Sequence, residues 1–325
     1  MVEIKTNFAG LALDNPVIVS SSGLTNSVAK IQKLEAAGAG AVVLKSVFEE
    51  QITMQAGNMH GYGSPEADDY LGTYVRSHAL NEHITLIKEA KKVCRIPIIA
   101  SINCYSDSEW TDFARLMEEA GADALEINIL SLQTSKDYEY GSFEQRHIDI
   151  LRHIKKAVAI PVIMKLGSNF TNPIALINQL YANGADGIVL FNRFYQPDIN
   201  IEEQSFATSN IMSSPAELAD KIRWTAIASA EVPQMSYALS GGVHSGTSVV
   251  KAVLAGASAV EVCSVIYQNG EKVIESMKNE LADWMEKNGY ESLMQFKGKL
   301  NAKAEGAVTP FERTQFMKYY SSHEE

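Results

Sequence analysis

Two lysines in this chain follow uninterrupted apolar runs, where a charged side chain is uncommon. Lys45 ends the stretch "AVVLK", and Lys165 follows "IPVIM". An ammonium group at such a place loses hydration, so it must face an anion or a reacting group. The sequence therefore predicts that both lysines point into a site. A salt bridge to a carboxylate of the same core is an alternative explanation for one of them.

Amide and small polar groups follow several other apolar runs. Asn128 ends "ALEIN", and Asn192 follows "GIVLF". Amides can pair with the hydrogen-bonding edge of a planar ring, because they carry donors and an acceptor. Two adjacent glycines, Gly241 and Gly242, follow "ALS", and their bare backbone N–H groups could bind a phosphate. The smaller polar residues at such places are Ser22, Ser46, Cys263 and Ser264.

A nine-residue phrase that occurs four times indicates which elements position these residues. It reads "AGAGAVVLK", "AGADALEIN", "NGADGIVLF" and "AGASAVEVC". The glycine after the first residue is typical of the left-handed position that ends a helix, and the apolar run is typical of a strand buried on both faces. Each phrase therefore predicts a helix end followed by a strand of a parallel sheet.

Four further apolar runs bring the predicted strands to eight, at residues 15–23, 96–104, 160–168 and 232–242. Amphipathic stretches predict seven helices, at residues 26–37, 108–120, 143–157, 172–183, 215–229, 246–255 and 270–288. This α/β alternation predicts a (β/α)8 TIM barrel in one domain. A doubly wound open sheet is the alternative, but no Gly-x-Gly-x-x-Gly fingerprint follows the first strand.

The barrel is expected to span residues 1–300, and the tail of residues 301–325 is expected to pack on the barrel or on a dimer partner. Two long segments with little periodicity, about residues 46–80 and 193–214, predict loops that cover or wall the site.

The carboxyl ends of the strands in such a barrel meet at one face, where the chemistry takes place. The lysines, amides and glycines would therefore share one cavity. Gly241-Gly242 and Cys263-Ser264 follow the seventh and eighth strands, the usual place of a phosphate site. A phosphate ligand beside lysines indicates either FMN, or a phosphorylated sugar with Lys165 as a Schiff-base nucleophile. The two amides favour the flavin.

The composition excludes several other classes of function. The net charge is −11 and the 28 basic residues form no long run, which argues against nucleic acid as a partner. No apolar run approaches the roughly 18 to 20 residues of a membrane span, and the first residues do not resemble a secretory signal, so we expect a cytoplasmic protein. The three cysteines have no metal-binding spacing, and no metal site is predicted.

Six phrases in this chain, in order and approximate spacing, resemble the dihydroorotate dehydrogenase family, especially its soluble class-one members. They are "NPVIVSSSG", "VVLKS", "ALEIN", "VIMKL", "ALSGGVHSG" and "NGYESLMQFKGKL", and they extend over most of the chain. The resemblance implies an FMN-dependent oxidoreductase that acts on the CH–CH bond of dihydroorotate or a related small planar substrate in pyrimidine biosynthesis. It also implies a homodimer.

The resemblance implies roles for individual residues as well. Lys45 would reach toward flavin and substrate, and Lys165 would lie near flavin N1 and O2. Asn128 and Asn192 would hydrogen-bond the ring and the substrate. The remaining cofactor-binding positions would be Ser22, Gly23 and Ser46 beside the ring, and Gly241, Gly242, Cys263 and Ser264 at the phosphate.

The sequence departs from the family on the substrate side. After the fourth strand the family reads Asn-x-Ser-Cys-Pro-Asn, with the cysteine, or a serine in its place, as catalytic base. This chain reads "NILSLQ", which puts Ser131 at the base position and removes the proline and the second asparagine. Lys45 and Ser131 are therefore the predicted catalytic residues, with Cys104 as a further candidate base. A flavin-binding protein without dihydroorotate turnover is an alternative, as is the Schiff-base lyase.

Overall fold

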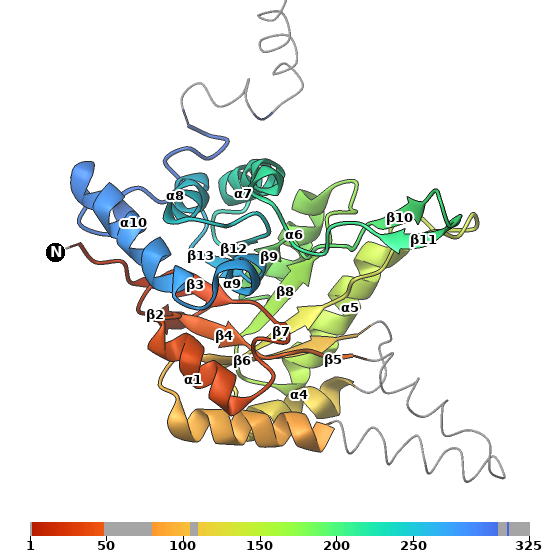
Figure 1. Ribbon diagram of the computed structural model, residues 1–325. Helices are drawn as coiled ribbons and strands as arrows, with labels where there is room; N and C mark the ends of the chain where they lie inside the picture. Colours follow the sequence, from red (N-terminus) through yellow and green to blue (C-terminus); the bar gives the residue numbers. More distant parts are fainter. Residues whose placement is uncertain (1, 49–79, 105–109, 305–310, 312–325) are drawn as a thin grey trace, which may run out of the picture.

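The computed structural model describes residues 2–48, 80–104, 110–304 and 311 of the chain (Figure 1). Eight parallel strands close into a barrel, because β4 pairs with β6 as well as with β3. Each strand overlaps one of the eight predicted runs, so the (β/α)8 barrel is confirmed. The strands are β3 (Val17–Val19), β4 (Ala41–Val43), β6 (Ile98–Asn103), β7 (Ala124–Asn128), β8 (Val162–Leu166), β9 (Gly187–Leu190), β12 (Ser236–Ser240) and β13 (Ala259–Val262).

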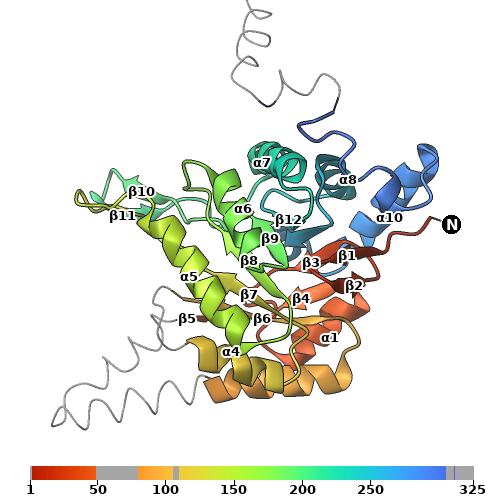
Figure 2. The same ribbon diagram turned by 180° about the vertical axis from the view of Figure 1, so that it is seen from behind.

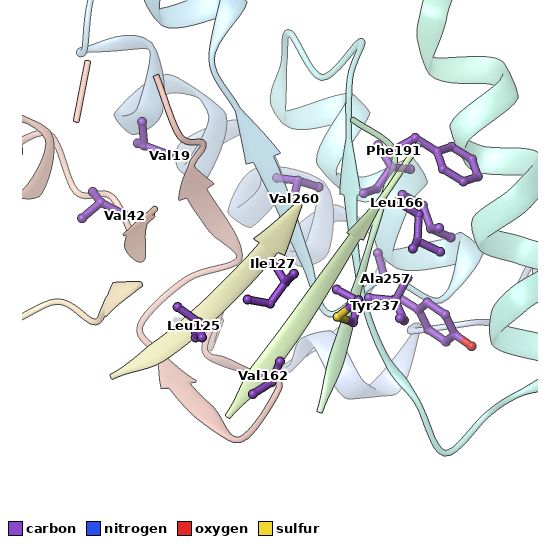
Figure 3. Packing of buried hydrophobic residues seen from close by; sticks show 14 of the residues in the cluster. Val19, Val42, Leu125, Ile127, Val162, Leu166, Phe191, Tyr237, Ala257 and Val260 are labelled. Atoms are coloured by element: carbon purple, nitrogen blue, oxygen red, sulfur yellow. The ribbon is translucent and has the colours of Figure 1, made fainter. Parts of the chain in front are cut away.

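Helices surround the barrel (Figure 2), and all seven predicted ones are present. They are α1 (Val28–Ala36), α4 (Trp110–Glu119), α5 (Ser142–Ala157), α6 (Pro173–Ala182), α7 (Leu218–Glu231), α8 (Gly246–Ala255) and α10 (Val273–Lys287). A helix at residues 80–93 and the short α9 (Ser264–Asn269) were not predicted. The outward side chains of the strands, such as Val42, Leu125 and Val162, belong to the large buried cluster between barrel and helices (Figure 3).

The predicted helix stops are confirmed by the backbone. Gly38, Gly121, Gly184 and Gly256, one in each repeated phrase, have φ angles of 90°, 97°, 93° and 114°. Residues with a Cβ rarely adopt this left-handed conformation, so glycine ends each helix and turns the chain into the next strand.

An antiparallel hairpin, β1 (Thr6–Phe8) and β2 (Leu11–Leu13), packs beneath the barrel interior. Phe8 and Leu13 are buried in one cluster with inward side chains of the strands. The hairpin approaches β9 closely, since a Cβ on Gly187 would lie 2.8 Å from the Cβ of Ala9. The lower end of the barrel is therefore filled and apolar.

The inward side chains change from apolar to charged toward the carboxyl ends of the strands. The four side chains of one layer in such a barrel come from alternate strands. Val43, Glu126, Val189 and Glu261 occupy the same position of the four repeated phrases and belong to β4, β7, β9 and β13, which alternate around the barrel. Two buried glutamates thus share a layer with two valines, which belong to the apolar cluster of the barrel interior.

The two predicted loops differ in what the structure describes. Residues 193–214 contain a hairpin, β10 (Pro197–Asn200) and β11 (Ser205–Thr208), followed by η1 (Pro215–Glu217). The loop after Lys45 is described only as far as β5 (Val47–Phe48), which pairs with β6. Its remainder, and nearly all of the predicted tail beyond residue 304, lie outside the described residues. In the described part, no helix has the length and apolar character needed to span a bilayer.

Candidate functional site

A cavity of about 480 Å³ opens at the carboxyl ends of the strands. Its size falls in the range of small-molecule sites. Nine of the predicted site residues line it, namely Ser22, Gly23, Lys45, Lys165, Asn192, Gly241, Gly242, Cys263 and Ser264. Prediction and structure therefore agree on where a ligand could bind.

One end of the cavity is made of backbone. Gly241 and Gly242 have φ angles of 97° and 76°, and they carry no side chains of their own to cover their N–H groups. A Cβ on Gly242 would lie only 2.4 Å from the backbone nitrogen of Leu218, at the start of α7. Glycine is therefore required at position 242 for the loop after β12 to approach α7.

The segment before α7 is fastened over this end of the cavity. Ser213 donates its backbone N–H to Ser264 Oγ at 2.9 Å, and its hydroxyl lies 3.1 Å from His244 Nε2. Arg193 donates to the carbonyls of Ile211 (2.7 Å) and Asn210 (2.8 Å) and to Glu217 (3.0 Å). The sequence prediction missed this clamp, although Ser214 and Glu217 form a readable capping box.

The two predicted amides meet at the other end of the cavity. Asn192, which follows β9, donates from Nδ2 to Asn128 Oδ1 at 2.9 Å. Asn128 is buried at the end of β7, and Asn192 lines the cavity. Asn192 Oδ1 also accepts from the Arg193 backbone N–H at 2.8 Å. These bonds leave the Asn128 Nδ2 donors and one lone pair of Asn192 Oδ1 for other partners, so the pair could present both donors and an acceptor to a planar ring.

A chain of hydroxyl groups lies behind the cavity wall. Ser46 Oγ is 2.9 Å from Ser21 Oγ and 2.7 Å from Ser101 Oγ, and the Ser46 N–H donates to Ser21. Ser46 is buried and does not line the cavity. Its observed contacts therefore fix the turn after Lys45.

The two lysines have different surroundings. Lys165 is 6% exposed, and its Nζ lies 2.5 Å from Glu261 Oε2, 3.4 Å from Glu126 Oε1 and 3.3 Å from Ser20 Oγ. The salt bridge considered from sequence is thus found at this lysine. Lys45 is exposed, lines the cavity, and forms no ion pair with any described residue.

Burial and neighbouring charges shift the pKa values of this cluster. Burial alone would lower the pKa of Lys165, but Glu126 and Glu261 raise it above its usual range. Burial and repulsion from Glu261 raise the pKa of Glu126 well above that of a free carboxyl. Burial also acts to raise the pKa of Glu261, yet attraction by Lys165 outweighs it, and the pKa is lowered. The two glutamates therefore keep Lys165 protonated, and a protonated lysine is a poor Schiff-base nucleophile.

The predicted base lies outside the cavity wall. Ser131 is half-buried in the loop after β7, where its Oγ accepts from Gln133 Nε2 at 3.2 Å and its carbonyl accepts from Asn169 Nδ2 at 2.9 Å. The alternative base, Cys104, is buried at the end of β6. Neither residue is among those that line the cavity. The catalytic roles of Ser131 and Lys45 stay predictions.

The donor set and the shape of this site fit FMN. The cavity joins a side-chain-free cradle to a paired-amide and lysine end, as a ligand with a phosphate at one end and a planar polar ring at the other requires. The approach beside Ser22 is also narrow, because a Cβ on Gly23 would lie 2.8 Å from Tyr267 Oη. Burial raises the pKa of Cys263, so the cradle carries a neutral thiol rather than a thiolate.

Comparison with known proteins agrees with this geometry. The family model for dihydroorotate dehydrogenase matches residues 3–285. The chain belongs to the dihydroorotate dehydrogenase family. The family consists of flavin-dependent oxidoreductases that act on a CH–CH bond.

The similar curated proteins include dihydroorotate dehydrogenases of two types. The catalytic subunit of dihydroorotate dehydrogenase B (NAD(+)) of Thermoplasma volcanium is 30% identical over 92% of this chain and 98% of its own length. The same subunit of Methanocaldococcus jannaschii is 27% identical over 87% and 93%. Dihydroorotate dehydrogenase A (fumarate) of Lactobacillus helveticus is 25% identical over 92% and 99%.

The most important residues that the sequence prediction missed are Glu126 and Glu261. Both stand at the seventh position of a repeated phrase, in "ALEIN" and "AVEVC", where the other two phrases have valine. A carboxylate in a strand buried on both faces needs a partner. The two glutamates at this position of the repeated phrase therefore indicated a buried cationic partner, and the structure shows that this partner is Lys165.

Proposed function

We propose that this chain is an FMN-dependent dehydrogenase that oxidises a CH–CH bond of dihydroorotate or a related small planar substrate. The observation that supports it most is one cavity that is lined by the Gly241-Gly242 cradle, by Lys165 and by Asn192, which is hydrogen-bonded to the buried Asn128 behind it. Family membership supplies the reaction class. Bound FMN would supply the acceptor for the hydride that leaves the substrate carbon.

The cradle residues hold the phosphate in this proposal. Gly241 and Gly242 offer backbone N–H groups, and Ser264 offers a hydroxyl next to Cys263. Ser22, Gly23 and Ser46 shape the wall beside the ring, directly or through the hydroxyl chain. The hydrogen bond from the Ser213 N–H to Ser264 Oγ would hold the segment before α7 over the phosphate.

The opposite end orients the reactants. Lys165 would offer an ammonium to a flavin bound in the cavity, where a preformed positive charge would stabilise the negative charge of the reduced ring without reorganisation. Asn128 and Asn192 hydrogen-bond ring and substrate. Lys45 is the exposed cation of the cavity that faces an anionic substrate group.

Ser131 removes the substrate proton in this proposal, by its place three residues after Asn128. A serine hydroxyl is a weak base, so the proton must pass through a neighbouring group or a water. The bond that Gln133 donates to Ser131 Oγ leaves the serine proton free to be passed on. The substrate-side changes around Ser131 make related dihydropyrimidines as worthwhile to test as dihydroorotate.

We further propose one FMN-binding domain over residues 1–300 and a cytoplasmic homodimer. The β10–β11 hairpin supports the dimer, because Phe206 is 94% exposed and Ile199 is 66% exposed on it. Exposed apolar groups that gather on one hairpin are typical of an interface. A change of Phe206 to Ser should shift the sedimentation coefficient to that of a monomer, and an unchanged dimer would place the interface elsewhere.

The test begins with the purified full chain. We expect a yellow protein that releases FMN on denaturation in a stoichiometric amount. Absence of the chromophore, together with no uptake of added FMN, would remove the proposal. A spectrum without flavin but with covalent trapping of a phosphorylated sugar by borohydride would instead support the lyase alternative.

Anaerobic mixing then tests the reaction. Dihydroorotate or another dihydropyrimidine should bleach the oxidised flavin band, with one equivalent of substrate per flavin. Arg223→Gln, a change in α7 away from the cavity-lining residues, serves as a control for handling. Full flavin occupancy without bleaching by any dihydropyrimidine would support the alternative of a flavin-binding protein without this turnover.

A further inference from the structure

A charged cluster crosses the barrel at the floor of the cavity, where Lys165 and Glu261 line the cavity and Glu126 lies behind them. Along the sheet order β13, β12, β9, β8, β7, the strands of Glu261 and Glu126 are four steps apart, which is halfway around the eight-stranded barrel. Their side chains nevertheless both reach Lys165 Nζ, at 2.5 Å and 3.4 Å. The two carboxyl groups therefore converge near the barrel axis.

The cluster has little access to solvent. Glu126 is 1% exposed and Glu261 is 2% exposed, and the layers below them are apolar. With Lys165 charged and both glutamates ionised, the sum is one net negative charge. A net charge on side chains that are this deeply buried carries a large desolvation cost, and one proton removes it.

The hydrogen bonds distinguish the two carboxyl groups. Glu261 Oε2 accepts from Lys165 and from Ser20 Oγ at 2.6 Å, as an ionised carboxylate prefers. Glu126 accepts only the longer bond from Lys165, and its Oε2 receives no donor among the described residues. Its other close polar neighbour is the Glu261 carboxyl group, with which it interacts as one carboxyl group with another. A buried oxygen without a donor is the poorer place for negative charge.

We propose that Glu126 is a neutral carboxylic acid under physiological conditions and that Glu261 is the carboxylate that positions the Lys165 ammonium at the cavity floor. Both act as positioning residues through Lys165. The electrostatics agree, since burial and Glu261 raise the pKa of Glu126, whereas Lys165 lowers that of Glu261 against the effect of burial. Lys165 and Glu261 are the charged groups that act on Glu126 among the described residues.

The shared proton makes the cluster adaptable. If Glu261 loses its charge, the repulsion that keeps Glu126 protonated disappears, and Lys165 then favours the ionised form of Glu126. Glu126 would release its proton and become the counter-ion. The cluster thus always contains one carboxylate and one ammonium. The positive charge of Lys165, which faces a ligand in the cavity, is then balanced by one negative charge in either case. This function of the cluster rests on the proposed flavin site; its protonation state does not.

Infrared difference spectra of the full chain test the protonation directly. The wild type at neutral pH should show the carbonyl stretch of a buried carboxylic acid that is missing in Glu126→Gln. The same band should also be missing in Glu261→Gln, because Glu126 ionises there. Glu118→Gln, a change to a carboxylate that accepts backbone bonds outside the barrel, should retain the band.

The opposite results overturn the proposal. A band that survives in Glu126→Gln would show that the buried acid is not Glu126. Absence of the band from the wild type and from both variants would mean that the cluster is anionic. Retention of the band in Glu261→Gln would contradict the exchange of counter-ions. If that variant does not fold, a pH titration of the wild type tests whether the cluster holds a proton. The acid band should disappear reversibly at high pH and be replaced by a carboxylate band, and a spectrum without an acid band at any pH would contradict the proposal.

A second readout links the cluster to the flavin. Lys165→Met should lower the affinity for reduced FMN relative to oxidised FMN on the order of tenfold. Glu126→Gln should shift this ratio far less, because it replaces one neutral group by another. An equally large shift in Glu126→Gln would contradict a neutral Glu126. A chain that binds no FMN would fail the proposed function but leave the infrared result interpretable.

Discussion

The two ends of the cavity are constructed differently. The cradle at Gly241 and Gly242 consists of backbone, and its function depends on the absence of side chains. The floor at Lys165, Glu126 and Glu261 consists of side chains from three strands, and its function depends on their charges. The cradle should therefore be sensitive to added volume, and the floor to altered charge.

The largest effect is expected at the cradle. In Gly242→Ala the new Cβ would lie 2.4 Å from the Leu218 nitrogen, so the loop must move and FMN binding should be lost. Gly241→Ala has the matched left-handed backbone, but its Cβ would lie 3.5 Å from the flexible Lys221 side chain. It should weaken FMN binding only about tenfold, from a strain of roughly 1–2 kcal/mol.

Titration with FMN, with circular dichroism as a control for folding, compares the two variants. Equal affinities for Gly241→Ala and Gly242→Ala would show that close approach to α7 does not form the cradle.

The next largest effect is expected at the floor. Lys165→Met keeps the volume but leaves two buried carboxyl groups without their cation, which should lower the free energy of unfolding by about 3–5 kcal/mol. Glu261→Gln in the same chain should recover part of this loss. Urea unfolding measures the free energy of unfolding of both variants. If the double variant is as unstable as Lys165→Met, the loss of stability does not come from the unpaired negative charge.

A smaller effect is expected at Ser131, in the loop after β7, which belongs to neither end of the cavity. Ser131→Ala should decrease the rate of flavin reduction on the order of a hundredfold, because the proton acceptor is missing, while FMN stays bound. Ser131→Cys should retain more of the rate, since a thiol loses its proton more readily. Stopped-flow reduction provides the measurement; an unchanged rate in Ser131→Ala would assign the base to another residue.

The smallest effect is a change of stability with pH. Because the pKa of Glu126 is raised in the folded chain, its contribution is present below the ordinary carboxyl pKa and is lost as the pH rises through the raised value. Glu126→Gln should remove this loss, so its stability should exceed that of the wild type at alkaline pH by on the order of 1 kcal/mol. Parallel pH profiles for the two chains would exclude a proton on Glu126.

Local sequence signals predicted the fold well. The four repeated phrases predicted helix ends at Gly38, Gly121, Gly184 and Gly256, and the backbone has the left-handed conformation at all four. The same phrases also predicted where several strands end, so the residues that follow those strands could be predicted to line the cavity. The helix at residues 80–93 was missed because it follows a long aperiodic stretch.

The cluster at the floor was only half predictable. The sequence predicted a partner for Lys165 but did not reveal which carboxylates it meets, since Glu126 and Glu261 are 135 positions apart and converge only when the barrel closes. The Arg193 clamp likewise depends on a loop conformation that no periodicity specifies.

Comparing FMN with riboflavin tests the central claim most directly, because the two ligands differ only in the phosphate. Quenching of flavin fluorescence by the flavin-free chain measures the affinity for each ligand. We predict an affinity for FMN at least on the order of a hundredfold above that for riboflavin, because charged hydrogen bonds at the cradle contribute roughly 1.5–3 kcal/mol each. Equal affinities for the two ligands would contradict a phosphate site at Gly241-Gly242.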